Sequence, residues 1–177
     1  MPLQDSVGFA DVAVALLEAG QRSLKRATDG LPDEFLYRQP APESNTIGWL
    51  VWHLSRWKDR TSAIMCDEKQ VWESGGWAEK FGLPVERTGI GDGPGLAAAF
   101  RVERGLLFAY ADAAQAAAVR RVAGLSPEQL QRPVLYMPQM EPQPAWRLLV
   151  SITMDSIQHT GQIAYVRGLI AGYGWSR

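Results

Sequence analysis

The sequence predicts an all-α protein, a four-helix bundle with a long irregular connection between its second and third helices. Four segments of roughly 20 to 28 residues each repeat hydrophobic residues at helical spacing. Glycine and proline separate these segments, and one connection, residues 67–95, is much longer than the others. The length of 177 residues fits one domain, so we expect residues 1–177 to fold as a single unit.

The first predicted helix runs from about Asp5 to Thr28. Hydrophobic residues recur along it at helical spacing, which predicts that they face the core: Phe9, Val12, Leu16, Leu17 and Leu24. The helix is expected to end before Gly30-Leu31-Pro32, because glycine and proline stop helices.

The second predicted helix runs from about Thr46 to Cys66, and Asn45 is expected to cap it. Its hydrophobic face comprises Ile47, Leu50, Leu54, Trp57 and Ile64. His53 lies at the edge of this face. The polar residues expected to lie away from it are Lys58, Asp59 and Ser62.

The connection that follows is less regular. It contains a short predicted helix at Trp77–Phe81 and then a passage rich in glycine and proline, residues 82–95. The third long helix, rich in alanine, is predicted from about Leu96 to Ala123. It stops at Leu125-Ser126-Pro127.

The last predicted helix covers about Ala145 to Ala171, after short extended pieces within residues 133–137. Its core-facing stripe comprises Leu148, Ile152, Asp155, His159, Ile163, Val166 and Ile170. Two members of this stripe are ionisable, and burying a polar group without a partner costs roughly 2–7 kcal/mol. Asp155 and His159 stand four positions apart and project side by side, so a compensating partner is expected near them.

A metal ion is one such partner. The chain has 2 histidines, and the other one, His53, lies near the core face of the second helix. Two neutral imidazoles and one carboxylate, with open positions for water or substrate, describe a catalytic metal site rather than a closed structural one. The alternative is that Asp155 and His159 pair only with each other, while His53 is a core histidine with satisfied hydrogen bonds. Spacing alone leaves both interpretations open.

The composition narrows the function classes. Lys plus Arg number 18 and Asp plus Glu 19, giving a net charge of -1, which argues against nucleic-acid binding. The N-terminus resembles no secretory signal, and no hydrophobic run approaches the ~18–20 residues that span a bilayer. Cys66 is the single cysteine, so no internal disulfide forms. We therefore expect a cytoplasmic protein without membrane contact.

Other candidate features carry weaker signals. The alternating glycines of residues 89–95 match no phosphate-binding motif, so a mobile loop or lid is the better interpretation. Cys66 has no base beside it in sequence, which favours an incidental thiol over a nucleophile. The residues considered for an anionic substrate are Arg56, Arg60 and Arg167, although solvated arginines are the simpler reading.

Two passages resemble the DinB/YfiT-like superfamily. They are Asn45 to Arg56, which contains His53, and Asp155 to Gly168, in which the ligand pair is followed by Gly161-Gln162. In that family the second helix supplies one histidine, and the last helix supplies a ligand pair four residues apart. Many members carry a histidine where this chain has Asp155. A carboxylate there is similar to mycothiol-dependent maleylpyruvate isomerase, which has the longer glutamate.

The resemblance has several implications. It implies an up-down-down-up bundle, often a homodimer, with a divalent metal held by His53, Asp155 and His159. Zinc is the first choice, with nickel or iron as alternatives. The resemblance also implies an enzyme that uses a low-molecular-weight thiol, of the mycothiol or bacillithiol type, on an electrophilic substrate by S-transfer or isomerisation. Residues expected to orient the ligands are Gln158, Gln162 and Tyr165.

Two other functions stay open at this point. One is a metal- or ligand-binding stress-response module without turnover. The other is non-haem iron chemistry, because two histidines and one carboxylate also suit Fe(II). No catalytic residue beyond the metal ligands is assigned from the sequence.

Overall fold

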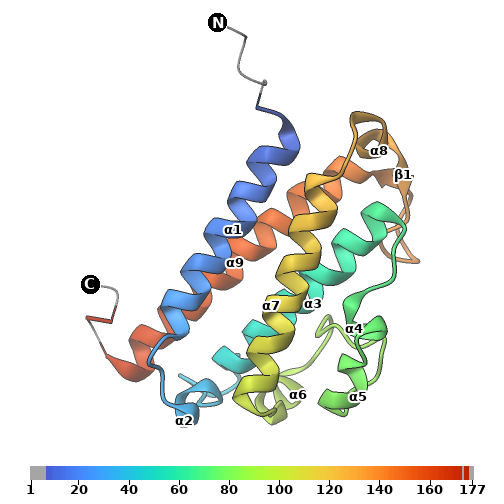
Figure 1. Ribbon diagram of the computed structural model, residues 1–177. Coiled ribbons are helices and arrows are strands. Elements are labelled where there is room, and N and C mark those ends of the chain that lie inside the picture. The colour runs from blue at the N-terminus through green and yellow to red at the C-terminus, as the bar shows by residue number, and fades with distance from the viewer. Residues whose placement is uncertain (1–6, 173, 176–177) are drawn as a thin grey trace, which may run out of the picture.

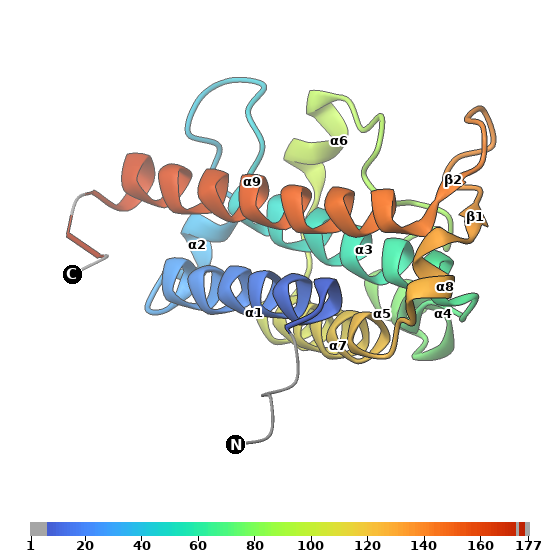
Figure 2. The ribbon, with the colours of Figure 1, turned by 90° about the horizontal axis from the view of Figure 1, so that it is seen from above.

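Four long helices form the body of the protein in the computed structural model, which describes residues 7–172, 174 and 175. They are α1 (Phe9–Thr28), α3 (Ile47–Cys66), α7 (Arg104–Ala123) and α9 (Ala145–Ala171). α1 and α9 run in one direction and α3 and α7 in the other (Figure 1). α3 packs against α7 and α9, and α1 packs against the same two helices (Figure 2). The predicted all-α, up-down-down-up four-helix bundle is confirmed.

Short elements fill the connections between the long helices. They are α2 (Asp33–Leu36), α4 (Val71–Ser74), α5 (Trp77–Phe81), α6 (Pro94–Ala99) and α8 (Pro127–Gln131), with an antiparallel pair of β1 (Pro133–Val134) and β2 (Gln143–Pro144). The predicted short helix at Trp77–Phe81 is confirmed with its bounds. The predicted third helix is divided into α6 and α7, because the Glu103 carboxylate accepts hydrogen bonds from the backbone N–H groups of Gly105 and Leu106 and caps a new helix there.

α1 differs from its prediction at its N-terminal half. The helix begins at Phe9, and Asp5, where it was predicted to begin, lies outside the described residues. The core prediction holds for Leu17 and Leu24. It is wrong for Phe9, Val12 and Leu16, which are 70%, 52% and 40% exposed. α1 packs mainly on α7 and α9, which cover one side of it, so helical spacing alone does not decide which hydrophobic side chains are covered.

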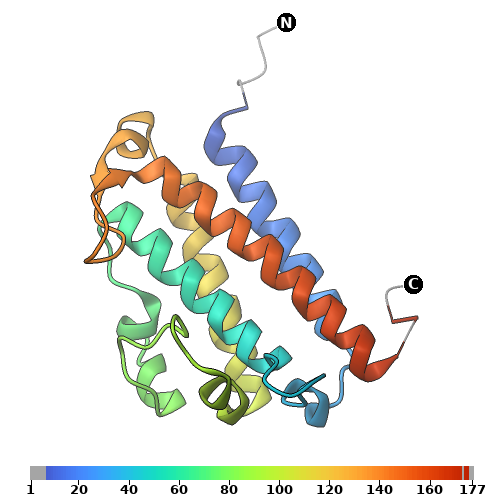
Figure 3. The ribbon, with the colours of Figure 1, turned by 180° about the vertical axis from the view of Figure 1, so that it is seen from behind.

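α3 is the central helix, and nearly all of its side chains are buried. Thr46 rather than Asn45 caps it, because the Thr46 hydroxyl accepts the N–H of Trp49 at 3.2 Å. The prediction that Lys58, Asp59 and Ser62 face outward is also wrong, since all three are buried. Nearly all sides of α3 are covered, because the irregular connection that contains α4 and α5 lies beside it in addition to α7 and α9 (Figure 3).

One buried polar cluster fixes this connection to α3. The carboxylate of Asp59 accepts the backbone N–H groups of Val71 and Trp72 at 2.9 and 2.8 Å, and pairs with Arg121 of α7 at 3.0 Å. Arg56 stacks over the Trp72 ring at 4.5 Å. The cluster therefore holds the start of α4 against the middle of the bundle.

α9 follows its prediction closely. It spans Ala145–Ala171 as expected, with Leu148, Ile152, Ile163 and Val166 buried. No helix in the described part of the chain is both long enough and hydrophobic enough to span a membrane.

Candidate metal centre

The two histidines and Asp155 meet at the interface between α3 and α9. One nitrogen of His53, one nitrogen of His159 and one carboxylate oxygen of Asp155 all lie within 4.8 Å of one another. The His53 and His159 rings are 5.0 Å apart between centroids and nearly perpendicular. The three residues that the sequence singled out are thus brought together, one from the middle of α3 and two from adjacent turns of α9.

His53 is oriented by a backbone carbonyl. Its Nδ1 lies 2.7 Å from the carbonyl oxygen of Thr88. A carbonyl oxygen only accepts, so Nδ1 carries the hydrogen and the lone pair of the neutral ring is on Nε2. Trp49, one turn earlier, stacks on the imidazole with centroids 4.8 Å apart and planes 7° apart. His53 therefore has little freedom to rotate away from α9.

The loop carrying Thr88 approaches His53 so closely that a glycine is needed next to it. Gly89 has φ +86°, and a Cβ there would lie 2.6 Å from His53 Nδ1 and 3.0 Å from the Trp49 ring. Asp92 accepts the Trp49 indole N–H at 3.0 Å and pairs with Arg87 at 2.8 Å. The interpretation of residues 89–95 as a mobile loop therefore misses a specific contact, because Gly89 is buried against the imidazole.

His159 is oriented from within α9. Its Nδ1 lies 2.7 Å from Gln162 Oε1, which leaves Nε2 directed at Asp155, 3.2 Å from Oδ1. The second oxygen of Asp155, Oδ2, is buried and has no hydrogen-bond partner among the described residues. The short aspartate therefore lies inside the cluster with one oxygen left unsatisfied.

The pKa values of the two histidines are shifted in opposite directions. Burial lowers the pKa of His53 below its ordinary value, although the Thr88 carbonyl and nearby Asp155 oppose this shift. Burial also disfavours the charged form of His159, but the hydrogen bond and charge of Asp155 outweigh it and raise the pKa of His159. Without a cation, His159 is thus the imidazole that takes up a proton and pairs with Asp155.

The donor set fits a divalent cation. Two imidazole nitrogens and a carboxylate converge, and a buried carboxylate oxygen without a partner is unfavourable unless a positive charge compensates it. The side chains of His159 and Asp155 are 17% and 16% exposed, so the cluster is not sealed from solvent. Nitrogen and oxygen ligands of this kind suit zinc, nickel and iron.

The structure also shows the contacts of the other residues that the sequence proposed for a functional role. Gln162 bonds to His159, a candidate ligand, whereas Gln158 and Tyr165 are exposed and make no such contact among the described residues. Arg56 is buried and bonded to the side chains of Gln70 and Tyr110 and to backbone carbonyls, so it is structural.

The other two arginines bind backbone carbonyls. Arg167 donates to the carbonyls of Arg26 and Ala27 at the end of α1. Arg60 donates to the carbonyl of Tyr136, while its Nη1 is buried without a partner in the described chain. Cys66 is half-buried, and burial raises the pKa of its thiol, which agrees with an incidental role.

Sequence reasoning missed the loop that orients His53. Thr88 contributes only its carbonyl, which any residue type possesses, so nothing in the sequence pointed to it. A signal was present in Gly89, whose positive φ and contact with His53 both require glycine, but a single glycine among several does not reveal its neighbour.

Comparisons with known proteins agree with this fold. No functionally curated protein is significantly similar to the chain. A solved structure, described as a conserved protein from Enterococcus faecalis, matches with a TM-score of 0.84 and 26% identity, over 95% of this chain and 100% of the other. The family model of the DinB superfamily matches residues 16–163, a span that includes α3, the irregular connection and all three converging residues. This chain is thus a member of the DinB superfamily.

Proposed function

We propose that the protein is a metal-dependent enzyme that uses a low-molecular-weight thiol to attack an electrophilic small molecule. The observation that supports it most is the convergence of His53, Asp155 and His159, with Asp155 Oδ2 buried and unpaired among the described residues. The thiol comes from the resemblance to thiol-using DinB-like enzymes, and zinc is the proposed ion.

The two histidines and Asp155 would have different roles at such a site. His53 and His159 present Nε2, because Thr88 and Gln162 occupy Nδ1, and Asp155 supplies the negative charge. A divalent ion held by these three residues would supply a positive charge that lowers the pKa of a thiol bound to it, so that the thiolate would be available at neutral pH. The S–H proton passes to solvent, a sulfur–carbon bond forms with the electrophile, and the leaving group departs with its electron pair.

Metal analysis tests the site before the reaction. Untagged protein should contain about one equivalent of divalent metal. The His159→Ala and His53→Ala variants should lose it while keeping the helical circular dichroism of the parent. Stoichiometric metal in both variants would place the ion elsewhere and end the proposal.

Activity measurements then test the chemistry. The protein should conjugate thiols of the mycothiol or bacillithiol type to a reactive probe such as monochlorobimane, and the two histidine variants should not. If the metal-loaded protein binds its ion but shows no thiol transfer, the alternative of a metal-binding module without turnover is favoured instead.

We also propose that the protein is a homodimer. Exposed hydrophobic side chains line the N-terminal ends of α1 and α9: Phe9, Val12, Leu16, Trp146, Val150 and Met154. Phe9, Val12, Leu16 and Val150 line one shallow pocket together, so these side chains adjoin one another. A contiguous apolar surface of this kind is typical of an interface, and a stable interface buries about 800 Å² per partner. Analytical ultracentrifugation should give a dimer that a Phe9→Glu, Val150→Glu variant converts to a monomer. A monomeric parent protein would contradict this.

A further inference from the structure

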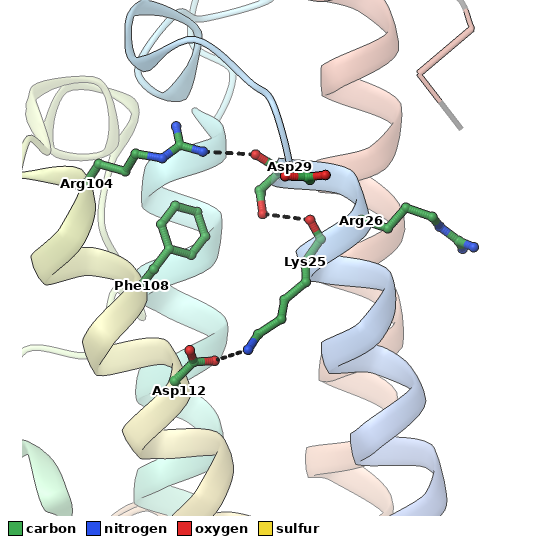
Figure 4. A pocket seen from close by; sticks show the side chains of 7 residues that line it. Lys25, Arg26, Asp29, Arg104, Phe108 and Asp112 are labelled. Atoms are coloured by element: carbon green, nitrogen blue, oxygen red, sulfur yellow. Dashed lines mark hydrogen bonds and ion pairs between the residues drawn. The ribbon is translucent and has the colours of Figure 1, made fainter. Parts of the chain in front are cut away.

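Side chains of α1 and α7 line a groove between these two helices, which both face the viewer in Figure 1. It holds two adjoining cavities, of about 530 and 380 Å³, and both are lined by Lys25 and Asp112. Figure 4 shows Lys25 reaching from α1 to Asp112 of α7, at 2.9 Å, with Phe108 beside this ion pair and Arg26 pointing away. Volumes of this order suit a small organic molecule.

A lysine lies beneath the second cavity. Lys58 of α3 is 1% exposed, and its Nζ donates to Gln115 Oε1 at 2.7 Å and to Gln21 Oε1 at 3.2 Å. Gln21 and Gln115 both line the cavity. Two neutral amide oxygens therefore hold this ammonium group, and it forms no ion pair within the described residues.

The other buried cations of the described chain are compensated in ways that Lys58 is not. Arg56 and Arg121 pair with the Asp59 carboxylate, and Arg167 binds carbonyls at the negative end of α1. Burial lowers the pKa of Lys58 to about 7, while Asp155 and Asp112 oppose that shift from a distance. The core beside the groove thus contains a lysine whose charged form has no counterion among the described residues.

A second donor beside the same lysine also lacks a partner. Gln115 is 8% exposed, and its Nε2 is buried without an acceptor among the described residues. The amide orientation is fixed, because Oε1 must face the lysine. Leaving an amide N–H group unpaired in the interior is unfavourable, so an acceptor is missing at this point.

The rest of the lining, taken together with Lys58 and Gln115, indicates the class of ligand that the groove would bind. Its rim charges are paired with each other, Arg22 with Glu18 and Lys25 with Asp112, so they do not favour either sign strongly. Ala116, Val119 and Phe108 supply apolar surface. A ligand that accepts from Gln115 and compensates Lys58 is an anion, and the apolar lining suits a hydrocarbon body.

We propose that the groove between α1 and α7 is a second ligand site, separate from the metal centre, that binds a small organic carboxylate through Gln115 Nε2 and the charge of Lys58. The two glutamines lie between the cavity and the lysine, so both side chains adjust as the carboxylate enters. The site is independent of whether the metal centre performs thiol chemistry.

Butyrate is a suitable probe, with butyramide as its uncharged isostere. In NMR titrations of the full chain, butyrate should shift backbone amide signals of α1 and α7 saturably, both with and without a metal chelator. It should also raise the pKa of Lys58, followed on the side-chain nitrogen. Butyramide should bind at least tenfold more weakly.

Three variants separate the contributions. Lys58→Met and Gln115→Leu should each weaken butyrate binding at least tenfold, while Arg147→Gln, an exposed change on α9 that lines neither cavity, should not change it. Equal binding of butyramide, undiminished butyrate binding in both variants, or shifts confined to the α3–α9 interface would each overturn the proposal. Absence of metal or thiol-transfer activity would leave these outcomes unaffected, because the ligand and the variants lie elsewhere.

Discussion

α3 carries two polar clusters, around His53 and Asp59, that lie less than two turns apart, and they differ in how completely the protein satisfies their hydrogen bonds. Asp59 Oδ1 accepts the Val71 N–H and the Arg121 guanidinium, and Oδ2 accepts the Trp72 N–H and the Tyr110 hydroxyl. Around His53, by contrast, the partner carboxylate of Asp155 keeps one buried oxygen without a donor among the described residues. Both carboxylates lie beside cation-forming side chains in the same interior.

The difference indicates what each cluster does. A cluster in which every polar atom is hydrogen-bonded stabilises the fold and has no free atom for a ligand. A cluster with an unpaired polar atom can bind a partner from outside the chain through that atom. Saturation of hydrogen bonds, more than burial or charge, therefore separates the structural Asp59 from the candidate ligand Asp155. The following experiments test this contrast.

The largest effect is expected at Asp59. Asp59→Ala leaves the Arg121 guanidinium and two backbone N–H groups without their acceptor, which should cost about 3–5 kcal/mol of unfolding free energy. Urea denaturation measures this cost, and Asp59→Asn provides a milder variant if the alanine protein does not fold. Asp155→Ala in metal-free protein is the matched control and should cost less than about 1 kcal/mol. Equal losses in the two alanine variants would remove the distinction between the clusters.

The effect of Lys58 on the stability of the fold should depend on pH. Its pKa is about 7 in the folded protein against 10.5 when unfolded, so below pH 7 the charged lysine destabilises the fold, and the penalty disappears as pH rises toward 10.5. The shift corresponds to about 4–5 kcal/mol, and the hydrogen bonds lost to Gln21 and Gln115 offset about 1 kcal/mol of it. Lys58→Met should therefore be more stable than the parent by about 3–4 kcal/mol at pH 6.5, and the difference should shrink by pH 10. Thermal unfolding at both pH values measures it; a constant difference would show that burial does not shift this lysine.

Gln162 tests the orientation of the metal ligands. Gln162→Leu removes the acceptor that holds the His159 Nδ1 hydrogen, so metal affinity should fall about 10–100-fold. Competition with a chromophoric chelator measures the affinity. Gln158→Leu, an exposed change four positions earlier, is the control and should leave the affinity unchanged. A decrease of similar size in both variants would assign the effect to helix stability rather than to ligand orientation.

The smallest expected effect concerns the loop over His53. Gly89→Ala and Gly91→Ala both place a methyl group at positive φ, 86° and 77°, but only the first meets His53. Each should lose about 1 kcal/mol of stability from backbone strain. Gly89→Ala alone should also weaken metal binding several-fold, because its Cβ displaces the imidazole. Identical metal affinity in the two variants would show that the loop does not position His53.

Much of the fold was predictable because helical spacing and helix breakers are local signals. The bounds of α9 and its buried stripe followed from residues three and four apart, and the Asp155–His159 pair came with them. His53 could be associated with this pair because the chain has 2 histidines and its passage resembles a known family. Contacts that cross the bundle gave no such local signal.

The wrong predictions concern residues whose partners lie far away in the sequence. Lys58 and Asp59 were placed outward because polar residues usually face solvent, yet their partners Gln115 and Arg121 are more than fifty positions away. The position of Gly89 against His53 likewise depends on the path of the whole connection. Local patterns identify elements and candidate ligands, whereas the partners that satisfy buried polar groups are known only once the helices are assembled.

The donor set of the candidate centre contains no sulfur, and this has a consequence for redox chemistry. Imidazole and carboxylate do not exchange with disulfides, so small thiols and their oxidised forms can reach this centre without forming mixed disulfides with its ligands. The one cysteine, Cys66, stands at the far end of α3 with a thiol that burial makes less acidic. Oxidants that inactivate cysteine-ligated metal proteins should therefore leave this ligand set intact.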